Sequence, residues 1–190
     1  MKPSDLIKAT IVLLILVVLA VGYYHNDTTE SVPGENKSRL ANSYLEDGKL
    51  EQALATFDEA IALNPDYSES HRGKAITLML LGRFDASRVL FDRAIELAPT
   101  SALAYANRAT LNDRTGRYEE AIRDYRKAAT LDPKLAAGPG RLWRFLHNIQ
   151  ERPPTIIDRA DYLEEQLARP EAERLLRIPA LDAQQRMYKK

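Results

Sequence analysis

Residues 34 to 135 repeat one pattern of small, apolar and turn-forming residues with a period of 34. Glycine, proline, alanine, leucine and aromatic residues each return in the same frame. The matching positions are Gly48, Gly82 and Gly116; Pro65, Pro99 and Pro133; Ala41, Ala75 and Ala109; Ala60, Ala94 and Ala128; Leu63, Leu97 and Leu131; and Phe57, Phe91 and Tyr125. A period of this size indicates one supersecondary unit that is copied and stacked on itself.

Each repeated position has a physical role in a pair of helices. The glycines fall between two amphipathic stretches, where a helix can end on a residue with positive φ. The prolines lack an N–H and fix φ near −65°, so they separate one pair from the next. The alanines allow close helix approach and the aromatics fill the space between. Each unit is therefore expected to be a hairpin of two antiparallel helices.

This pattern resembles the tetratricopeptide repeat (TPR) family over Gly34 to Leu135. The resemblance implies an all-α protein, a right-handed superhelical stack of three hairpins at 34–67, 68–101 and 102–135, closed by a C-terminal capping helix. The aromatic residue that the family places early in the first helix is present only as Tyr105, with Lys37 and His71 at the earlier positions.

A stack of hairpins leaves an apolar face that a further helix must cover. We expect that capping helix within 136–152, where Leu142, Phe145, Leu146 and Ile149 follow helical spacing. Trp143 has two interpretations, packing against the third repeat or anchoring a partner.

The remaining residues, 153–190, form a predicted helical C-terminal extension and tail. Thr155 or Asp158 is suited to cap a helix that runs toward Arg169-Pro170. A short helix is predicted over Glu171–Arg177, and a polar tail follows from Ala180. Two roles remain open for this extension, a peripheral appendage or a second partner-contacting element.

The N-terminal residues 1–25 predict a single transmembrane helix, because Ile11 to Val21 contains no polar side chain. Residues 26–33 form a linker. Lys2 and Lys8 precede the span, whereas Asp27 and Glu30 follow it, so the positive-inside rule keeps the N-terminus in the cytoplasm and exports the repeats. The predicted localisation is a single-pass membrane protein whose TPR domain lies on the periplasmic or other extracytoplasmic side.

Two alternatives exist for this segment. A basic start, an apolar stretch and the triplet Ala20-Val21-Gly22 also fit a cleavable signal peptide. A buried helix of a soluble core is the other alternative, although a helix that is apolar on every side lacks a solvent face.

The sequence offers no pattern for catalysis or for a cofactor. It contains no cysteine, and His25, His71 and His147 are scattered without ligand spacing, so we expect no metal site. It lacks a phosphate-binding G-x-x-x-x-G-K-[ST] loop, which argues against nucleotide binding. The 27 Lys and Arg balance the 27 Asp and Glu, so no net field favours nucleic acid. We predict a non-enzymatic protein without cofactors.

The resemblance implies that the first helix of each hairpin lines a concave groove for a protein or peptide client. The predicted groove residues are Arg39, Asn42 and Leu45; Arg72, Ile76 and Met79; and Asn107, Thr110 and Arg114. Some relatives bind chaperone tails through a two-carboxylate clamp at fixed groove positions. Ser38, Gly73 and Leu103 occupy three of those positions, and only Asn42 and Asn107 match. A chaperone-tail receptor is therefore not expected.

The predicted function is a membrane-anchored adaptor or scaffold that mediates protein–protein interaction during assembly of an envelope or membrane complex. A permanent structural subunit of such a complex is the first alternative. A regulatory subunit of an enzyme is the second, and it would require a polar pocket that the sequence does not indicate.

Overall fold

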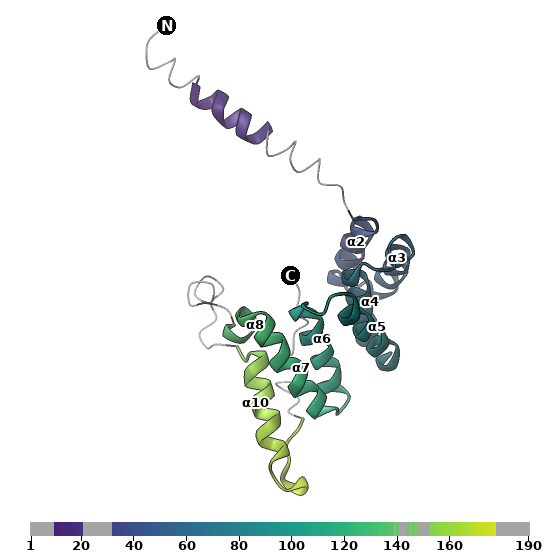
Figure 1. Ribbon diagram of the computed structural model, residues 1–190, viewed down its shortest axis with the longest axis vertical. Coiled ribbons are helices and arrows are strands. Elements are labelled where there is room, and N and C mark those ends of the chain that lie inside the picture. Colours follow the sequence, from purple (N-terminus) through teal and green to yellow (C-terminus); the bar gives the residue numbers. More distant parts are fainter. Residues whose placement is uncertain are drawn as a thin grey trace. The chain divides into compact units, whose positions relative to one another are not determined.

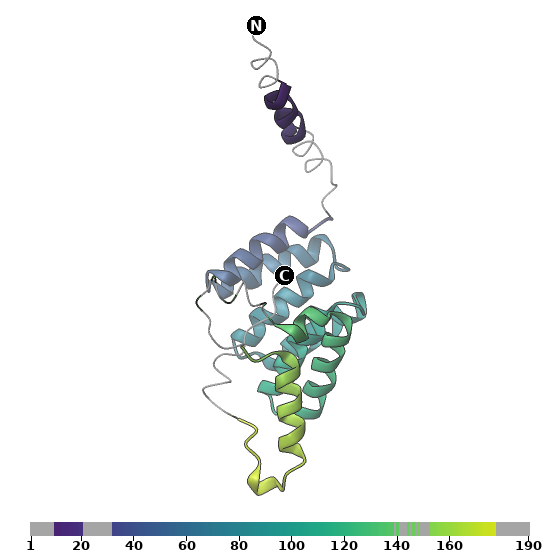
Figure 2. The same ribbon diagram turned by 90° about the vertical axis from the view of Figure 1, so that its left-hand side faces the viewer.

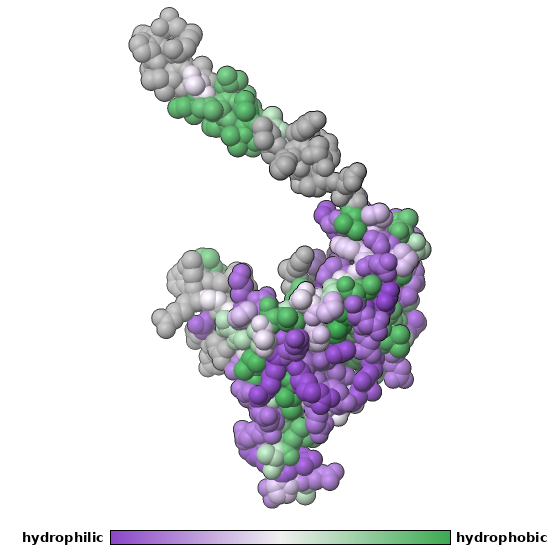
Figure 3. Space-filling model, in the orientation of Figure 1, coloured by the Kyte–Doolittle hydropathy of each residue, from purple (hydrophilic) through white to green (hydrophobic). Residues whose placement is uncertain are grey.

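The computed structural model describes residues 10–20, 32–138, 140, 144, 146, 148 and 153–177. The chain divides into two compact units, 1–33 and 34–190. In the first unit, residues 10–20 are helical, and the large apolar side chains from Ile11 to Leu19 are 50–68% exposed. Figure 3 shows this helix as an apolar surface. Among the described residues, no helix combines the length and apolar character that crossing a membrane requires.

The second unit contains three helical hairpins in succession, and its described residues include no strand (Figures 1 and 2). Each of the three 34-residue units encloses one pair of helices. The pairs are α2 (Glu35–Glu46) with α3 (Leu50–Leu63), α4 (Ser68–Leu80) with α5 (Phe84–Leu97), and α6 (Ala102–Arg114) with α7 (Tyr118–Leu131). The described part of the chain is thus all-α, as predicted.

The three glycine turns have the predicted backbone conformation. Gly48, Gly82 and Gly116 have φ of +74°, +74° and +79°. At the middle turn, the Gly82 N–H donates to the Met79 carbonyl at 3.1 Å, and the Arg83 N–H donates to the Leu78 carbonyl at 2.9 Å. This pair of bonds is the Schellman arrangement, which satisfies the last carbonyls of α4 and reverses the chain.

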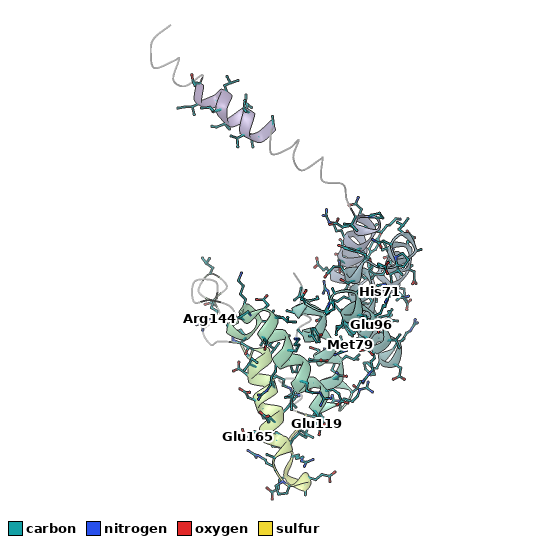
Figure 4. The ribbon with its side chains drawn as sticks, viewed as in Figure 1. His71, Met79, Glu96, Glu119, Arg144 and Glu165 are labelled. Atoms are coloured by element: carbon teal, nitrogen blue, oxygen red, sulfur yellow. The ribbon has the colours of Figure 1, made fainter. Side chains whose placement is uncertain are left out.

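The repeated alanines and aromatics form the core of the stack. Ala41, Ala75, Ala109, Ala60, Ala94 and Ala128 are 0% exposed, and Phe57, Phe91 and Tyr125 are no more than 1% exposed. The leucine column differs, because Leu63 lies mostly in solvent at 58%. His71, labelled in Figure 4, stands at the early aromatic position and bonds through Nε2 to the Pro65 carbonyl at 2.7 Å.

Arg108, which is partly buried, joins the second and third hairpins through ion pairs. Its guanidinium donates two bonds of 2.8 Å to Asp124 on α7 and one of 2.8 Å to Asp92 on α5. The hydrogen bond with Asp124 is the main cause that raises the pKa of Arg108 above its usual range. The cation therefore stays charged and bridges three consecutive helices.

The described cap of the stack is α10 (Ile156–Leu167), which packs against α7. Thr155 and Asp158 form a reciprocal capping box at its start, so both of the predicted capping residues are used. Ile156, Ala160 and Leu163 are buried at 0%. Helix α10 is therefore an integral layer of the fold.

Two predictions for the C-terminal region have different outcomes. The short helix expected over Glu171–Arg177 is wrong, because only Glu171–Glu173 forms a 3-10 turn and residues 174–177 are not helical. Pro170 precedes that turn, and Arg174 has the extended dihedral angles φ −74° and ψ 127°. The structure describes a five-residue helix α8 (Pro133–Ala137), but most of the capping helix expected within 136–152, with Trp143, lies outside the described residues.

Gly82→Val should lower the free energy of unfolding by about 1 to 3 kcal/mol, because a β-branched residue is strained at positive φ. A Cβ at this position meets no atom within 4 Å, so the cost comes from the backbone alone. Gly82→Asn is the matched control and should cost less, since asparagine tolerates the left-handed region. Equal melting temperatures for Gly82→Val and the parent chain would contradict the role of this turn.

Candidate peptide-binding surface

The first helix of each hairpin lies on the inner side of the stack. Helix α2 packs directly against α4, and α4 packs against α6, whereas the described second helices α3 and α5 make no comparable contact with each other. Helices that contact their counterparts in the next repeat line the shorter, concave side of a curved stack. We call four register positions on each of these helices the inner stripe: Glu35, Arg39, Asn42 and Glu46 on α2; Glu69, Gly73, Ile76 and Leu80 on α4; and Leu103, Asn107, Thr110 and Arg114 on α6.

Helix α2 presents an accessible part of the inner stripe. The Arg39 side chain is 71% exposed and pairs with Glu35 one turn earlier at 2.6 Å. Asn42 is half-buried and Glu46 is exposed. An i,i+4 pair of this kind contributes no more than about 0.5 kcal/mol to stability, so Arg39 can exchange Glu35 for another partner.

The two apolar groove residues that are predicted on α4 are part of the core. Ile76 and Met79 are each 2% exposed and belong to a cluster with Phe91 and Leu111 (Met79 in Figure 4). Both residues are predicted to line the groove, but the structure places them in the core, where their contacts hold α4 within the stack. Leu45 is likewise 8% exposed and packs in the same cluster.

Arg72 is also buried, at 6%, and its guanidinium bonds to Glu69 on the same helix. A charge reversal at Arg72 would place two carboxylates together with little solvent. Beside this pair, burial together with Glu35 and Glu69 raises the pKa of the Tyr67 hydroxyl.

On α6, Asn107 and Thr110 are both 0% exposed, and the Thr110 hydroxyl donates to the Ala106 carbonyl at 3.1 Å. Arg114 is half-buried. Of the nine predicted groove residues, the structure thus leaves Arg39, Asn42 and Arg114 accessible to some degree and buries the other six.

The positions of a two-carboxylate clamp are filled by packing groups. Ser38 is 2% exposed and its hydroxyl bonds to that of Ser70. A Cβ at Gly73 would approach the Phe57 ring to 2.2 Å, so any residue larger than glycine fits there only if that ring moves. The structure therefore gives a steric reason for the missing clamp.

Sequence reasoning missed an ion pair at the C-terminal end of the inner surface. Arg159 on α10 donates from Nε and a terminal nitrogen to the two oxygens of Asp113 on α6, at 2.7 and 2.8 Å. The two side chains are 14% and 2% exposed. A signal existed, because the third repeat has Asp113 where the other two have apolar Leu45 and Met79.

Side chains of α10 also hold an extended stretch of chain, residues 174–177, through the backbone atoms of that stretch. The Leu175 N–H donates to Gln166 Oε1 at 2.8 Å, and the Tyr162 hydroxyl donates to the Leu175 carbonyl at 2.5 Å. Arg159 donates to the Leu176 carbonyl at 3.2 Å. These three contacts are made to main-chain atoms of Leu175 and Leu176, so they do not depend on the side chains of those two residues.

The same stretch reaches the end of α6. Leu176 packs partly buried against the cluster that contains Tyr125 and Leu163. The Arg177 guanidinium donates to the Arg114 carbonyl at the C-terminus of α6.

No group of acidic, histidine or cysteine side chains suited to a metal ion occurs in the part of the chain that the structure describes.

Comparisons with known proteins identify the repeats. Two family models, both described as tetratricopeptide repeat, match residues 38–102 and 102–135 and together cover just over half of the chain. A DnaJ homolog subfamily C member 7 homolog from Dictyostelium discoideum is 30% identical over 104 residues, which are 53% of this chain and 19% of that protein. An uncharacterized protein of Methanocaldococcus jannaschii is 43% identical over 44 residues, 23% of this chain and 51% of its own length. The chain thus matches only part of each relative.

Solved structures show the same fold. The TPR domain of Arabidopsis OM64 superposes with a TM-score of 0.52 at 22% identity, covering 61% of this chain and 92% of that one. The first TPR of Spaghetti (RPAP3), bound to the HSP90 peptide SRMEEVD, superposes with a TM-score of 0.56 at 17% identity, covering 74% and 97%. At these identities the likeness shows the fold alone.

Asp113→Met should lower the free energy of unfolding by about 3 to 5 kcal/mol, because it leaves the Arg159 charge buried without its partner. The double variant with Arg159→Met should recover most of that loss, since the other repeats already place apolar residues at the position of Asp113. Thermal or denaturant unfolding of both single variants and the double variant measures the coupling. Additive losses would show that the pair is not coupled.

Proposed function

We propose that this chain, which belongs to the tetratricopeptide repeat family, is a non-enzymatic adaptor. It would hold a protein or peptide client on its inner surface. The observation that carries this proposal is a set of contacts on the face of α10. There the side chains of Arg159, Tyr162 and Gln166 hydrogen-bond to the extended backbone of residues 174–177 of the same chain. A related fold, the first TPR of Spaghetti, was solved with a bound peptide, which supports the same class of partner here.

The accessible inner surface is suited to a polar, extended client. Arg39 offers a guanidinium that its weak pairing with Glu35 leaves free to exchange partners, and Asn42 offers both a donor and an acceptor. An extended peptide carries unsatisfied backbone groups that such side chains can bind. The client proposed here is not a chaperone tail held by two carboxylates, because Gly73 and Ser38 occupy clamp positions.

We further propose that the apolar N-terminal segment anchors the protein in a membrane and places the repeats on the exported side. Its support is the run without polar side chains from Ile11 to Val21, together with Lys2 and Lys8 on the preceding side. In the described part, residues 10–20, a helix exposes apolar side chains that water solvates poorly. An adaptor held in this way would act in the assembly of an envelope or membrane complex.

A permanent structural subunit is the second candidate, and co-purification distinguishes it from an assembly factor. Crosslinking in native membranes, followed by mass spectrometry, names the client. A structural subunit should then remain stoichiometric after mild detergent extraction, whereas an assembly factor should be substoichiometric.

Arg39→Glu should abolish capture of that client while it changes the free energy of unfolding by no more than about 0.5 kcal/mol, because the side chain is exposed. Arg93→Glu on the outer helix α5 is the matched control; its side chain is 43% exposed and it should retain capture. Pull-down and thermal melting measure both properties. Capture by Arg39→Glu at the parent level would show that the α2 end of the inner surface does not contact the client.

A reporter that is active only in the cytoplasm should be inactive when fused after Lys190, because the charges around the apolar segment favour export of the C-terminal side. The matched control is the same fusion to a chain that begins at Gly34, which should be active. Activity of the fusion to the full chain would contradict the proposed topology.

A further inference from the structure

The extended residues 174–177, which we call the strap, lie against side chains of α10 that other contacts hold in place. The Arg159 guanidinium is fixed by its two bonds to Asp113, and its central carbon lies 5.5 Å from the centre of the Tyr162 ring. Gln166 is buried at 3%. Because the three α10 residues are spaced i, i+3 and i+7, they share one face of the helix. This face is therefore a preorganised site for a backbone.

The strap itself is held by much less. The chain reverses at the 3-10 turn Glu171–Glu173 and brings the strap back beside α10 (Figure 2). Leu175 is 62% exposed and Arg177 is exposed, whereas Leu176 is half-buried and packs against the core. A segment with few buried apolar contacts opens at a lower cost than the whole fold. We therefore expect the strap to leave α10 more readily than the helices unfold.

The contacts of the strap define which extended segment the site accepts. The Leu175 N–H and carbonyl are both bonded by α10 side chains, at 2.8 and 2.5 Å, which places no requirement on the exposed side chain. The Leu176 side chain packs against the buried apolar cluster shared by α6, α7 and α10, so an apolar residue fits there. Arg177 donates to the Arg114 carbonyl at the C-terminus of α6, where the helix dipole favours a cation.

We propose that the strap is an internal ligand of this site and that a client enters the site by displacing it. The displacing segment is extended and carries an apolar residue in place of Leu176 and a basic residue in place of Arg177. This inference rests on the function proposed above, and it names the class of client segment that the face of α10 receives.

Displacement makes the strap a regulator of client binding. Because the strap and its site belong to one chain, the strap competes with a client at an effective concentration of about millimolar. The apparent affinity for the client is then reduced in proportion to the fraction of molecules in which the site is open. A substitution that releases the strap should raise affinity, and a crosslink that closes the strap should lower it.

A synthetic peptide of residues 171–177, Glu-Ala-Glu-Arg-Leu-Leu-Arg with blocked ends and a fluorophore, tests the site without any client. Leu176→Asp in the full chain should raise the affinity for this peptide at least about tenfold, because a carboxylate is disfavoured in the apolar cluster and the strap leaves the site. Leu175→Asp is the matched control. Its side chain is exposed, so this chain should bind the peptide as the parent does. Fluorescence anisotropy measures the affinities.

The same variants in the peptide test what the site reads. A peptide with Leu176→Asp should bind the strap-released chain at least about tenfold more weakly than the parent peptide, and Arg177→Glu should also weaken binding. A peptide with Leu175→Asp should bind as the parent peptide does.

A crosslink gives a second test that does not depend on Leu176→Asp remaining folded. The chain has no cysteine, so Glu165→Cys with Leu175→Cys places two thiols at exposed positions on α10 and the strap. Joining them with a flexible bis-maleimide should lower peptide affinity at least about tenfold. Asp161→Cys with Glu165→Cys, one turn apart on α10, is the matched control. Its crosslink should leave peptide affinity unchanged.

The proposal is overturned if the crosslink between α10 and the strap leaves peptide affinity unchanged. It is also overturned if the Leu176→Asp chain melts at the parent temperature and binds the peptide no better than the Leu175→Asp chain. Because the probe is a segment of this chain and not a client, either result is distinguishable from failure of Arg39→Glu to lose client capture.

Discussion

Close contact between neighbouring helices at the alanine columns is the constraint on which the rest of this structure depends. Ala75 and Ala94 are 0% exposed, as are their counterparts in the other repeats, so no larger side chain fits without separating the helices. The aromatic rings use the space that small residues leave, and Phe57 lies where a Cβ on Gly73 would be. Dense packing of this kind fixes the distance between successive first helices, and therefore the curvature and width of the inner surface.

Opposite charges are matched between successive layers of the stack. Asp58 and Asp92 face Lys74 and Arg108 on the next hairpin, whereas the equivalent residue of the third repeat is Arg126, which faces Asp161 and Glu164 on α10. Exposed pairs add little stability, but like charges in contact are costly. The sign reversal therefore matches α10 to the third hairpin and opposes its docking on the first two.

The sequence predicts the features that depend on local geometry. Gly82, the alanine columns and the Thr155–Asp158 cap are each recognisable because a turn, a close approach or a capping bond needs that residue type at that spacing. The burial of Ile76 and Met79 could not be predicted. The family pattern predicts which face of a helix lies toward the groove, but not which residues pack against that face. The repeat pattern marks Asp113 as a departure from the apolar residues at the equivalent positions, but it does not identify Arg159, 46 residues away, as its partner.

The two ends of the inner surface differ in what they offer to a client. The polar α2 end, with Arg39 and Asn42, is accessible, whereas on the face of α10 the side chains of Arg159, Tyr162 and Gln166 already hold the backbone of residues 174–177. Under the proposed function, an extended client that is first captured at α2 would exchange with residues 174–177 one hydrogen bond at a time, because such contacts are independent of side-chain identity. Each bond contributes only about 0.5 to 1.5 kcal/mol net, which keeps this exchange reversible. In this proposal, selectivity comes in part from the exposed α2 end, where the side chains of the client would meet Arg39.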